Sequence, residues 1–208
     1  MKIALCRKAE ECRLPDLLQL RTPATGYARM DGVQWVMDNG SFSNFEERSF
    51  LRMACVGIAD RECLWIAMPD VVGNHGETVH LFDKYCDLLS RMWIPPPDLS
   101  KKACFVLQDG CNINSVPWER ITAVFLGGSD KFKMSRIAYL ILKEAKRRGK
   151  WVHVGRVNTP PRIHYFYEVA DSIDGSGIAK FDHMLDEALD TIEHLRGGKQ
   201  LTLEDWIE

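Results

Sequence analysis

Residues 35–45 read WVMDNGSFSNF, in which three apolar residues are followed at once by Asp38, Asn39 and Gly40. An apolar run that stops on polar and small residues is typical of a strand buried on both faces, and such strands occur in parallel sheets. Asp38 is therefore expected at the carboxyl end of a strand. A carboxylate in that place is either a turn residue or part of a site, and the other strands decide between the two readings.

Six further runs have the same construction, an apolar stretch that ends on polar or glycine residues. They are KIALC (2–6), LWIAMPD (64–70), ACFVLQDG (103–110), AVFLGG (123–128), WVHVGR (151–156) and DSIDGSG (171–177). Helical patterns lie between several of these strands, at 76–93, 135–148, 160–170 and 181–196. Strands that alternate with helices predict an α/β fold, here a TIM-like (β/α) barrel that is trimmed if its unclear eighth strand is absent. An open doubly wound sheet is the alternative.

Length and composition predict a single domain that spans residues 1–208. The net charge of -2 gives no global basic field, so a nucleic acid partner would need a local basic patch. Seven cysteines without a Cys-x-x-Cys pair argue against a zinc site or a disulfide framework and indicate reduced thiols in a cytoplasmic protein. Neither a metal nor another cofactor is expected. The residues MKIALCRKAEEC have the pattern of neither a signal peptide nor a membrane span, so no membrane partner is expected.

Acidic, amide, glycine or basic residues stand at the predicted carboxyl ends of six strands. They are Asp38, Asp70, Gln108, the pair Gly127 and Gly128, the pair Gly155 and Arg156, and Asp174. Taken singly, each has the ordinary explanation of a turn or a helix cap. In a barrel, however, the carboxyl ends of all strands surround one opening, and catalytic groups lie there. The pattern therefore predicts one site built from acids, an amide, bare backbone and a cation.

These segments resemble the tRNA-guanine transglycosylase superfamily, in the same order and along nearly the whole chain. DNGSFSNF (38–45) resembles the family's Asp-Ser-Gly-Gly-Phe-Gln stretch, and WIAMPD (65–70) resembles the strand that ends in its base-recognising aspartate. FVLQDG (105–110) is similar to its Val-Gln-Gly-Gly, and FLGG (125–128) to its Ile-Gly-Gly. VHVGRVNTPPRI (152–163) resembles its Met-Gly-Val-Gly-Thr-Pro strand with the following helix, and VADSIDGSG (169–177) the segment of its catalytic aspartate.

The resemblance implies a base-flipping enzyme, because a base must leave its stack before its glycosidic bond can be attacked. It implies Asp38 as the acid and base at the base edge, and Asp174 as the nucleophile that attacks C1′ of the sugar or stabilises its positive charge. Asp171 stays open as the alternative nucleophile. Burial and mutual repulsion would keep a proton on one carboxylate while the other ionises. The predicted contacts to the base are Phe42, as a platform, and Asp70, Gln108, Gly127, Gly128, His153, Gly155 and Arg156.

The chain also departs from the family. It lacks the cysteine and histidine cluster that binds the family's zinc and most of the length that serves tRNA recognition, and Arg156 replaces a small residue. The short chain is more similar to the DNA-acting branch of the superfamily, which handles bases in phage and bacterial DNA modification or defence. DNA is therefore the expected partner rather than tRNA. Basic residues that follow the strand ends are expected to contact phosphates, namely Lys131, Lys133, Arg136, Arg162 and Lys180.

The leading hypothesis is a DNA glycosylase that releases a modified base, leaves an abasic site and serves in phage defence. A transglycosylase that exchanges guanine for a 7-deazaguanine base in DNA or tRNA is the first alternative. A barrel that binds a modified base without cleaving a bond is the second, and it belongs to a different functional class. An unrelated barrel hydrolase that acts on a small molecule is a third.

Overall fold

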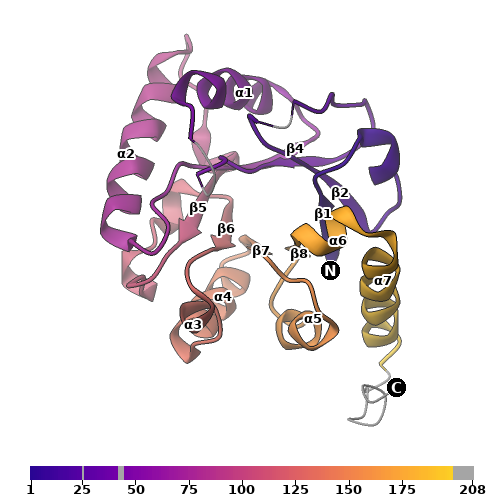
Figure 1. The fold of residues 1–208 in the computed structure, drawn as a ribbon. Helices are drawn as coiled ribbons and strands as arrows, with labels where there is room; N and C mark the ends of the chain where they lie inside the picture. Colours follow the sequence, from indigo (N-terminus) through magenta and orange to yellow (C-terminus); the bar gives the residue numbers. More distant parts are fainter. Residues whose placement is uncertain (25, 42–44, 199–208) are drawn as a thin grey trace.

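The computed structural model describes residues 1–24, 26–41 and 45–198, and the chain forms a closed barrel of eight parallel strands (Figure 1). The strands follow one another around the barrel in chain order, and the last pairs with the first. Their bounds are β1 (Lys2–Leu5), β2 (Leu17–Arg21), β3 (Trp35–Met37), β4 (Cys63–Ala67), β5 (Ala103–Leu107), β6 (Ala123–Leu126), β7 (Trp151–Val154) and β8 (Ser172–Ile173). The TIM-like barrel is thus confirmed, and the open doubly wound sheet is wrong.

Helices stand around the outside of the strands (Figure 1). The longer ones are α1 (Glu47–Ala59), α2 (His75–Arg91), α4 (Arg136–Arg147) and α7 (Asp182–Arg196), and the shorter ones are α3 (Asp130–Lys133), α5 (Pro160–Phe166) and α6 (Ser176–Lys180). Polar side chains cap several of them. Asn74 is the N-cap residue before α2 and Ser135 the N-cap residue before α4, and each accepts a hydrogen bond from a backbone N–H of the first turn. Within the described residues, no helix is long and apolar enough to cross a membrane.

The eighth strand, which the sequence pattern leaves unclear, is β2, and its residues LLQLR lie between β1 and β3. Leucine, glutamine and arginine favour helices, so the local sequence does not indicate this strand. Its pairing with both neighbours makes it a strand, because burial in the barrel wall outweighs propensity. Helix α1 is another element that the sequence pattern does not predict. Its N-cap residue is Glu46, whose side chain accepts hydrogen bonds from the N–H groups of Arg48 and Ser49.

Successive residues of each strand point to opposite sides of the barrel wall. One set fills the interior with fully buried side chains that include Ala4, Leu18, Val36, Trp65, Cys104 and Ala123. The other set packs against the helices and includes Ile3, Leu5, Met37, Phe105 and Leu126. The large side chains of both sets each contribute about 1.5–3 kcal/mol by leaving water. The barrel therefore has a solid centre and an outer shell of apolar contacts that hold the strands in place.

The same alternation places polar side chains at one opening. The position two residues beyond the last interior residue of a strand faces the carboxyl end of the barrel. Asp38 follows the interior residue Val36 in this way, and Gln108 follows Val106. The strand period thus explains why a short apolar run followed by an acid or an amide delivers that group to the mouth of the barrel.

Candidate active site

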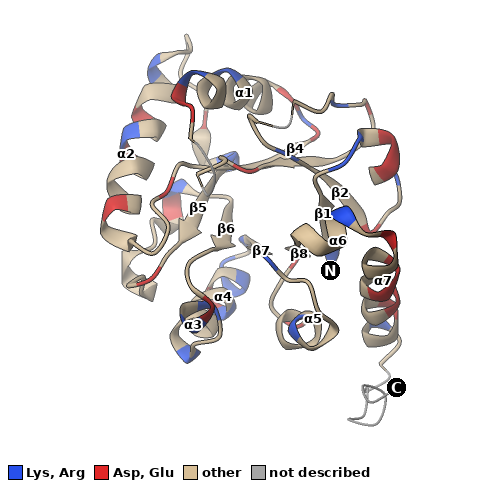
Figure 2. Cartoon of the chain, viewed as in Figure 1, with Lys and Arg blue, Asp and Glu red and all other residues tan. Residues whose placement is uncertain are grey.

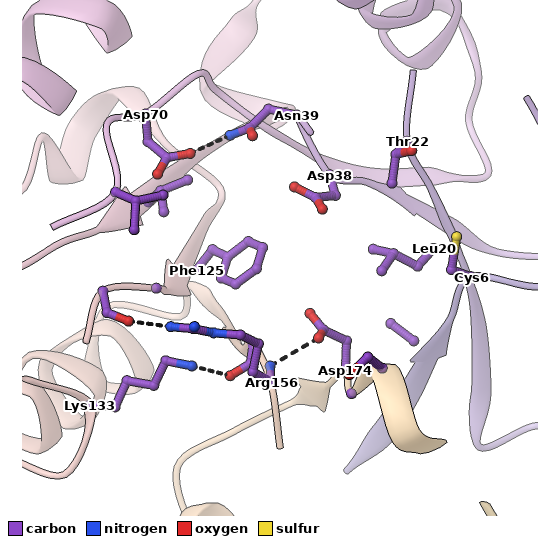
Figure 3. Close-up of a pocket in the computed structure, with 18 of the residues that line it drawn as sticks. Cys6, Leu20, Thr22, Asp38, Asn39, Asp70, Phe125, Lys133, Arg156 and Asp174 are labelled. Carbon is purple, nitrogen blue, oxygen red and sulfur yellow. Dashed lines mark hydrogen bonds between the residues drawn. The ribbon is translucent and has the colours of Figure 1, made fainter. Parts of the chain in front are cut away.

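A cavity of about 340 Å³ opens at the carboxyl ends of the strands (Figure 3). Its volume lies within the range of about 300–1,000 Å³ that is usual for small-molecule sites. The residues of its lining that matter for chemistry are Asp38, Asn39, Asp70, Gln108, Phe125, Gly127, Gly128, Lys133, Gly155, Arg156 and Asp174. All the strand-end residues singled out in the sequence therefore surround a single cavity.

Asp38 follows β3 and Asp174 follows β8, and both carboxylates point into this cavity (Figure 3). Burial raises the pKa of Asp38 to about 6, and the negative charge of Asp174 acts in the same direction. The N–H of Gly40, 3.3 Å from Oδ1 of Asp38, opposes the rise only in part. Asp38 thus keeps its proton in a pH range where an exposed aspartate is ionised.

The pKa of Asp174 is shifted in the opposite direction from that of Asp38. Burial by itself would raise its pKa, but hydrogen bonds reverse the direction, and the pKa of Asp174 lies below its usual value. The ring nitrogen Nε2 of His153 lies 2.9 Å from Oδ2, and the backbone nitrogen of Arg156 lies 3.0 Å from Oδ1. The positive charge of Lys133 adds to this effect. Two carboxyl groups of one cavity therefore have pKa values that are moved apart, so that one is neutral where the other is ionised.

A chain of hydrogen bonds through the barrel interior supports Asp174. The indole nitrogen Nε1 of Trp151 lies 2.8 Å from Oγ of Ser172, and that oxygen lies 2.8 Å from Nδ1 of His153. Because an indole N–H can only donate, Ser172 accepts from Trp151 and has its own hydroxyl proton to offer to His153. The Nε2 atom of His153 donates to Oδ2 of Asp174, because an ionised carboxylate can only accept. These hydrogen bonds favour the ionised form of Asp174 and fix the orientation of its carboxylate.

The opposite wall of the cavity contains a second carboxylate network. Asn39 donates to Oδ1 of Asp70 over 2.7 Å and to the carbonyl of Met68 over 2.8 Å, while Gln108 donates to Oδ2 of Asp70 over 2.6 Å. The N–H of Gly73 in turn holds the amide oxygen of Gln108 at 2.8 Å. Burial raises the pKa of Asp70, against the effect of these hydrogen bonds. Each oxygen of Asp70 keeps acceptor capacity for a further donor, because a carboxylate oxygen has two lone pairs.

Arg156 stands at the mouth with a backbone φ of 60°, a left-handed conformation that is uncommon for a residue other than glycine. This conformation directs its N–H to Asp174, while its guanidinium group donates to the carbonyl of Gly128 (Figure 3). Strained backbone of this kind is found mostly at functional sites, where the surrounding contacts hold it. Arg156 therefore joins the ends of β6 and β7 and at the same time supplies a donor to the carboxylate.

Phe125 of β6 is the one aromatic side chain among the described residues that line the cavity. Its ring meets His153 edge-on, with the centroids 4.6 Å apart, and Trp65 at 6.1 Å. Sequence reasoning missed this residue and proposed Phe42 as the platform, which lies outside the described residues. The available signal was the alternation in AVFLGG, because Phe125 precedes Gly127 by two positions and so faces the same side of the wall.

The structure separates the two candidate nucleophiles. Asp174 lines the cavity, whereas Asp171 precedes β8 and lies at the amino ends of the strands, the far end of the barrel. The carboxylate of Asp171 pairs with Lys146 and accepts a hydrogen bond of 2.8 Å from the backbone N–H of Val152. Asp171 therefore serves the barrel wall and cannot reach a molecule in the cavity.

Other predicted residues lie in different surroundings. His153 does not line the cavity; it is fully buried beneath it, so the expected contact with a base becomes a contact with Asp174. Lys133 is buried in the cavity wall, which does not fit the expected contact with phosphates at the surface. Lys131, Arg136 and Lys180 are exposed, and Arg162 pairs with Asp130 over 2.9 Å. Figure 2 shows the basic segments of α3, α5 and α6 in blue.

Among the described residues, no group of three histidine, cysteine, aspartate or glutamate side chains has the arrangement of a metal site. Comparison of the chain with protein-family models gives no match. Comparison with curated proteins gives no match either.

Proposed function

We propose that the chain cleaves the N-glycosidic bond of a modified base in DNA and releases the base, leaving an abasic site. The observation that carries the proposal is the pair Asp38 and Asp174, two carboxyl groups in one cavity whose pKa values differ in opposite directions from the usual value. A protonated and an ionised carboxyl group on either side of a glycosidic bond are the requirement of glycoside cleavage.

The steps follow from the two protonation states. Asp38, still protonated, gives its proton to the nitrogen of the departing base, and the bond between that nitrogen and C1′ breaks. The carboxylate of Asp174 attacks C1′ or stabilises the positive charge that develops there. Water then adds at C1′, where it displaces the carboxylate of Asp174 if that group has bonded there, and a proton of the water passes to Asp38, which restores the starting state. His153 and the N–H of Arg156 favour the ionised form of Asp174 at the start of the reaction.

The remaining walls support binding of a flat heterocycle. The oxygens of Asp70 can accept hydrogen bonds from N–H groups on the edge of a base, and Gln108 and Asn39 fix their direction. Phe125 offers an apolar ring within the cavity. The absence of a side chain at Gly127 makes room for Gln108, since a Cβ atom at Gly127 would lie only 2.7 Å from the amide nitrogen of Gln108.

DNA as the carrier of the base is supported by exposed cations near the mouth. Lys131 lies on α3, Arg136 begins α4 and Lys180 ends α6, all after the carboxyl ends of β6 or β8. Such residues bind phosphates without reading sequence and position the strand over a pocket. The resemblance to the DNA-acting branch of the transglycosylase superfamily favours DNA over tRNA and a part in defence against phages.

The test uses the purified protein with a panel of DNAs and tRNAs that includes phage DNAs with modified bases. Released bases are measured by mass spectrometry, and abasic sites are measured as strand breaks after alkali. Base release without any added base, lost in Asp38→Asn and Asp174→Asn and kept in Asp171→Asn, is the expected result. Release only when a free deazaguanine is supplied would indicate the transglycosylase. Tight binding without release would indicate the non-catalytic module. If the protein neither binds any of these nucleic acids nor releases a base from them, a nucleic acid is not its substrate.

A further inference from the structure

Lys133 is the last residue of α3 and lines the cavity, yet only 3% of its surface is exposed. Lysine is almost never buried to this degree unless a carboxylate pairs with it. Among the described residues, no carboxylate forms an ion pair with Lys133, and its Nζ donates instead to the carbonyl of Gly155 (Figure 3). The role proposed above for the two aspartates makes no use of this amine.

The surroundings of Lys133 favour the neutral form of its amine. Burial lowers its pKa to about 8, and the nearby guanidinium group of Arg156 acts in the same direction, as does Arg162 more weakly. Asp174 and Asp130 oppose the shift. At pH 8 about half of such amines are neutral, against less than about 1% for an ordinary lysine. Burial and a neighbouring cation are the two means by which proteins turn a lysine into a nucleophile toward carbonyl carbons.

We propose that Lys133 captures the aldehyde carbon C1′ of an abasic site in DNA as an imine and then breaks the strand on the 3′ side of that sugar. This inference rests on the proposed function, because removal of a base produces the abasic sugar in the cavity that Lys133 lines. The sugar at an abasic site exchanges between a closed ring and an open chain with a free aldehyde at C1′. The amine therefore meets a carbonyl substrate without any co-reactant.

The step balances without an oxidant or a reductant. The lone pair of Nζ forms a bond to C1′, and the carbonyl oxygen takes up protons and leaves as water, which gives the protonated imine. The imine makes the hydrogen at C2′ acidic, and the carboxylate of Asp174 accepts that proton. The electron pair left at C2′ forms a double bond to C3′ and expels the 3′ phosphate oxygen with its electrons. Water then hydrolyses the imine and frees the amine.

The test uses an oligonucleotide with one abasic site, made by enzymatic removal of a single uracil, at pH 8. Sodium borohydride should reduce the imine and leave the protein covalently attached to DNA, and without borohydride the strand should be cut. Lys133→Met and Lys133→Arg should lose both products by at least about tenfold, because neither side chain can form the imine. Lys143→Met is the matched control, since Lys143 is an exposed lysine of the next helix, α4, with no part in the proposed site, and it should keep both products.

A second measurement needs no variant. The wild-type protein is treated with glyceraldehyde and cyanoborohydride at pH 8, and peptide mass spectrometry locates the modified lysines. Preferential labelling of Lys133 over Lys131 is expected, despite the burial of Lys133. Absence of a trapped DNA complex, or a complex that persists in Lys133→Met, would overturn the inference.

The abasic oligonucleotide has no base to release at the test site, so it reports on the lysine alone. Base release without trapping would leave the proposed function intact and remove this inference. Trapping at Lys133 without base release from any DNA would remove the glycosylase and keep the lysine chemistry.

Discussion

The Nε2 atom of His153 lies 2.9 Å from Oδ2 of Asp174, and the ring of His153 is fully buried between that carboxylate and Ser172. A buried carboxylate is stable as an anion only where donors replace water. His153 and the N–H of Arg156 are these donors, one on each oxygen. The ionised state that the proposed function requires of Asp174 is therefore provided in part by His153, which does not touch the cavity. His153 is a positioning residue in this scheme.

Replacement of His153 should move the pH profile of base release. In His153→Leu the pKa of Asp174 should rise, because burial then acts against fewer donors. The acid limb of the profile should move to higher pH, and the rate at neutral pH should fall about tenfold or more. His153→Gln can still donate to Oδ2 and should recover part of the loss. If both variants merely lower the melting temperature and leave the shape of the profile unchanged, His153 has only a structural role.

Replacement of Asp38 by asparagine should stabilise the protein while it abolishes base release. A pKa raised from 3.8 to about 6 corresponds to on the order of 2–3 kcal/mol of lost stability. The penalty is absent well below pH 3.8, where folded and unfolded states are both protonated. It grows as pH rises through the range in which only the folded state keeps its proton, and it is complete above about pH 6.

Urea unfolding of the wild type and Asp38→Asn between pH 4 and pH 7 checks this prediction. The difference in free energy of unfolding should grow across that range in favour of the variant. A constant difference would mean that Asp38 titrates as an ordinary aspartate in the folded state, and the proposed acid would then lose its support.

The sequence predicted the site residues whose positions follow from the alternation of side chains along a strand. Asp38, Gln108 and Asp174 stand at strand ends in the sequence, and because strands of a barrel all open at one end, their convergence followed. The pairing of His153 with Asp174 joins β7 to the end of β8 and depends on which strands become neighbours. Sequence spacing does not contain that information, so His153 was expected against the base rather than beneath it.

Some secondary-structure elements also depend on neighbours that the local sequence does not reveal. Strand β2 consists of residues with helical propensity and becomes a strand only through its neighbours. Lys133 follows a strand end together with Lys131, and nothing in the local pattern separates the buried lysine from the exposed one. That difference arises from the direction of α3 over the cavity, which is a tertiary property.

Replacement of Asp171 should separate stability from activity. Its carboxylate pairs with Lys146 and accepts a hydrogen bond from the N–H of Val152, so Asp171→Ala should lose about 1–2 kcal/mol of folding free energy. Base release per folded molecule should stay at the wild-type level, because Asp171 lies at the amino ends of the strands. Thermal unfolding and initial rates below the unfolding temperature check both expectations. Loss of activity in a folded Asp171→Ala protein would contradict the assignment of Asp174.

The exposed cations near the mouth should govern the salt dependence of DNA binding. Arg136 begins α4 at the carboxyl end of the barrel, and Arg147 ends the same helix at the other side. Removal of one cation that neutralises a phosphate makes the slope of log affinity against log salt concentration shallower by about 0.9. Arg136→Ala should show this change in fluorescence anisotropy titrations of labelled DNA, and Arg147→Ala should not. Equal effects of the two substitutions would mean that DNA does not lie across the predicted face.

Gly155 should not tolerate a side chain. A Cβ atom at this position would lie 2.5 Å from Cε2 of Phe125 and 3.5 Å from Oδ2 of Asp174, so Gly155→Ala must displace the aromatic ring of the cavity. Overpacking of this kind costs about 1–3 kcal/mol, and base release should fall with it. Gly76→Ala is the matched control, because its nearest neighbour is 3.6 Å away and it lies in the first turn of α2, where alanine should add up to about 1 kcal/mol. Chemical unfolding and base release measured on both variants give the comparison. Full activity in Gly155→Ala would mean that the ring of Phe125 can move without harm, and its proposed contact with the base would be removed.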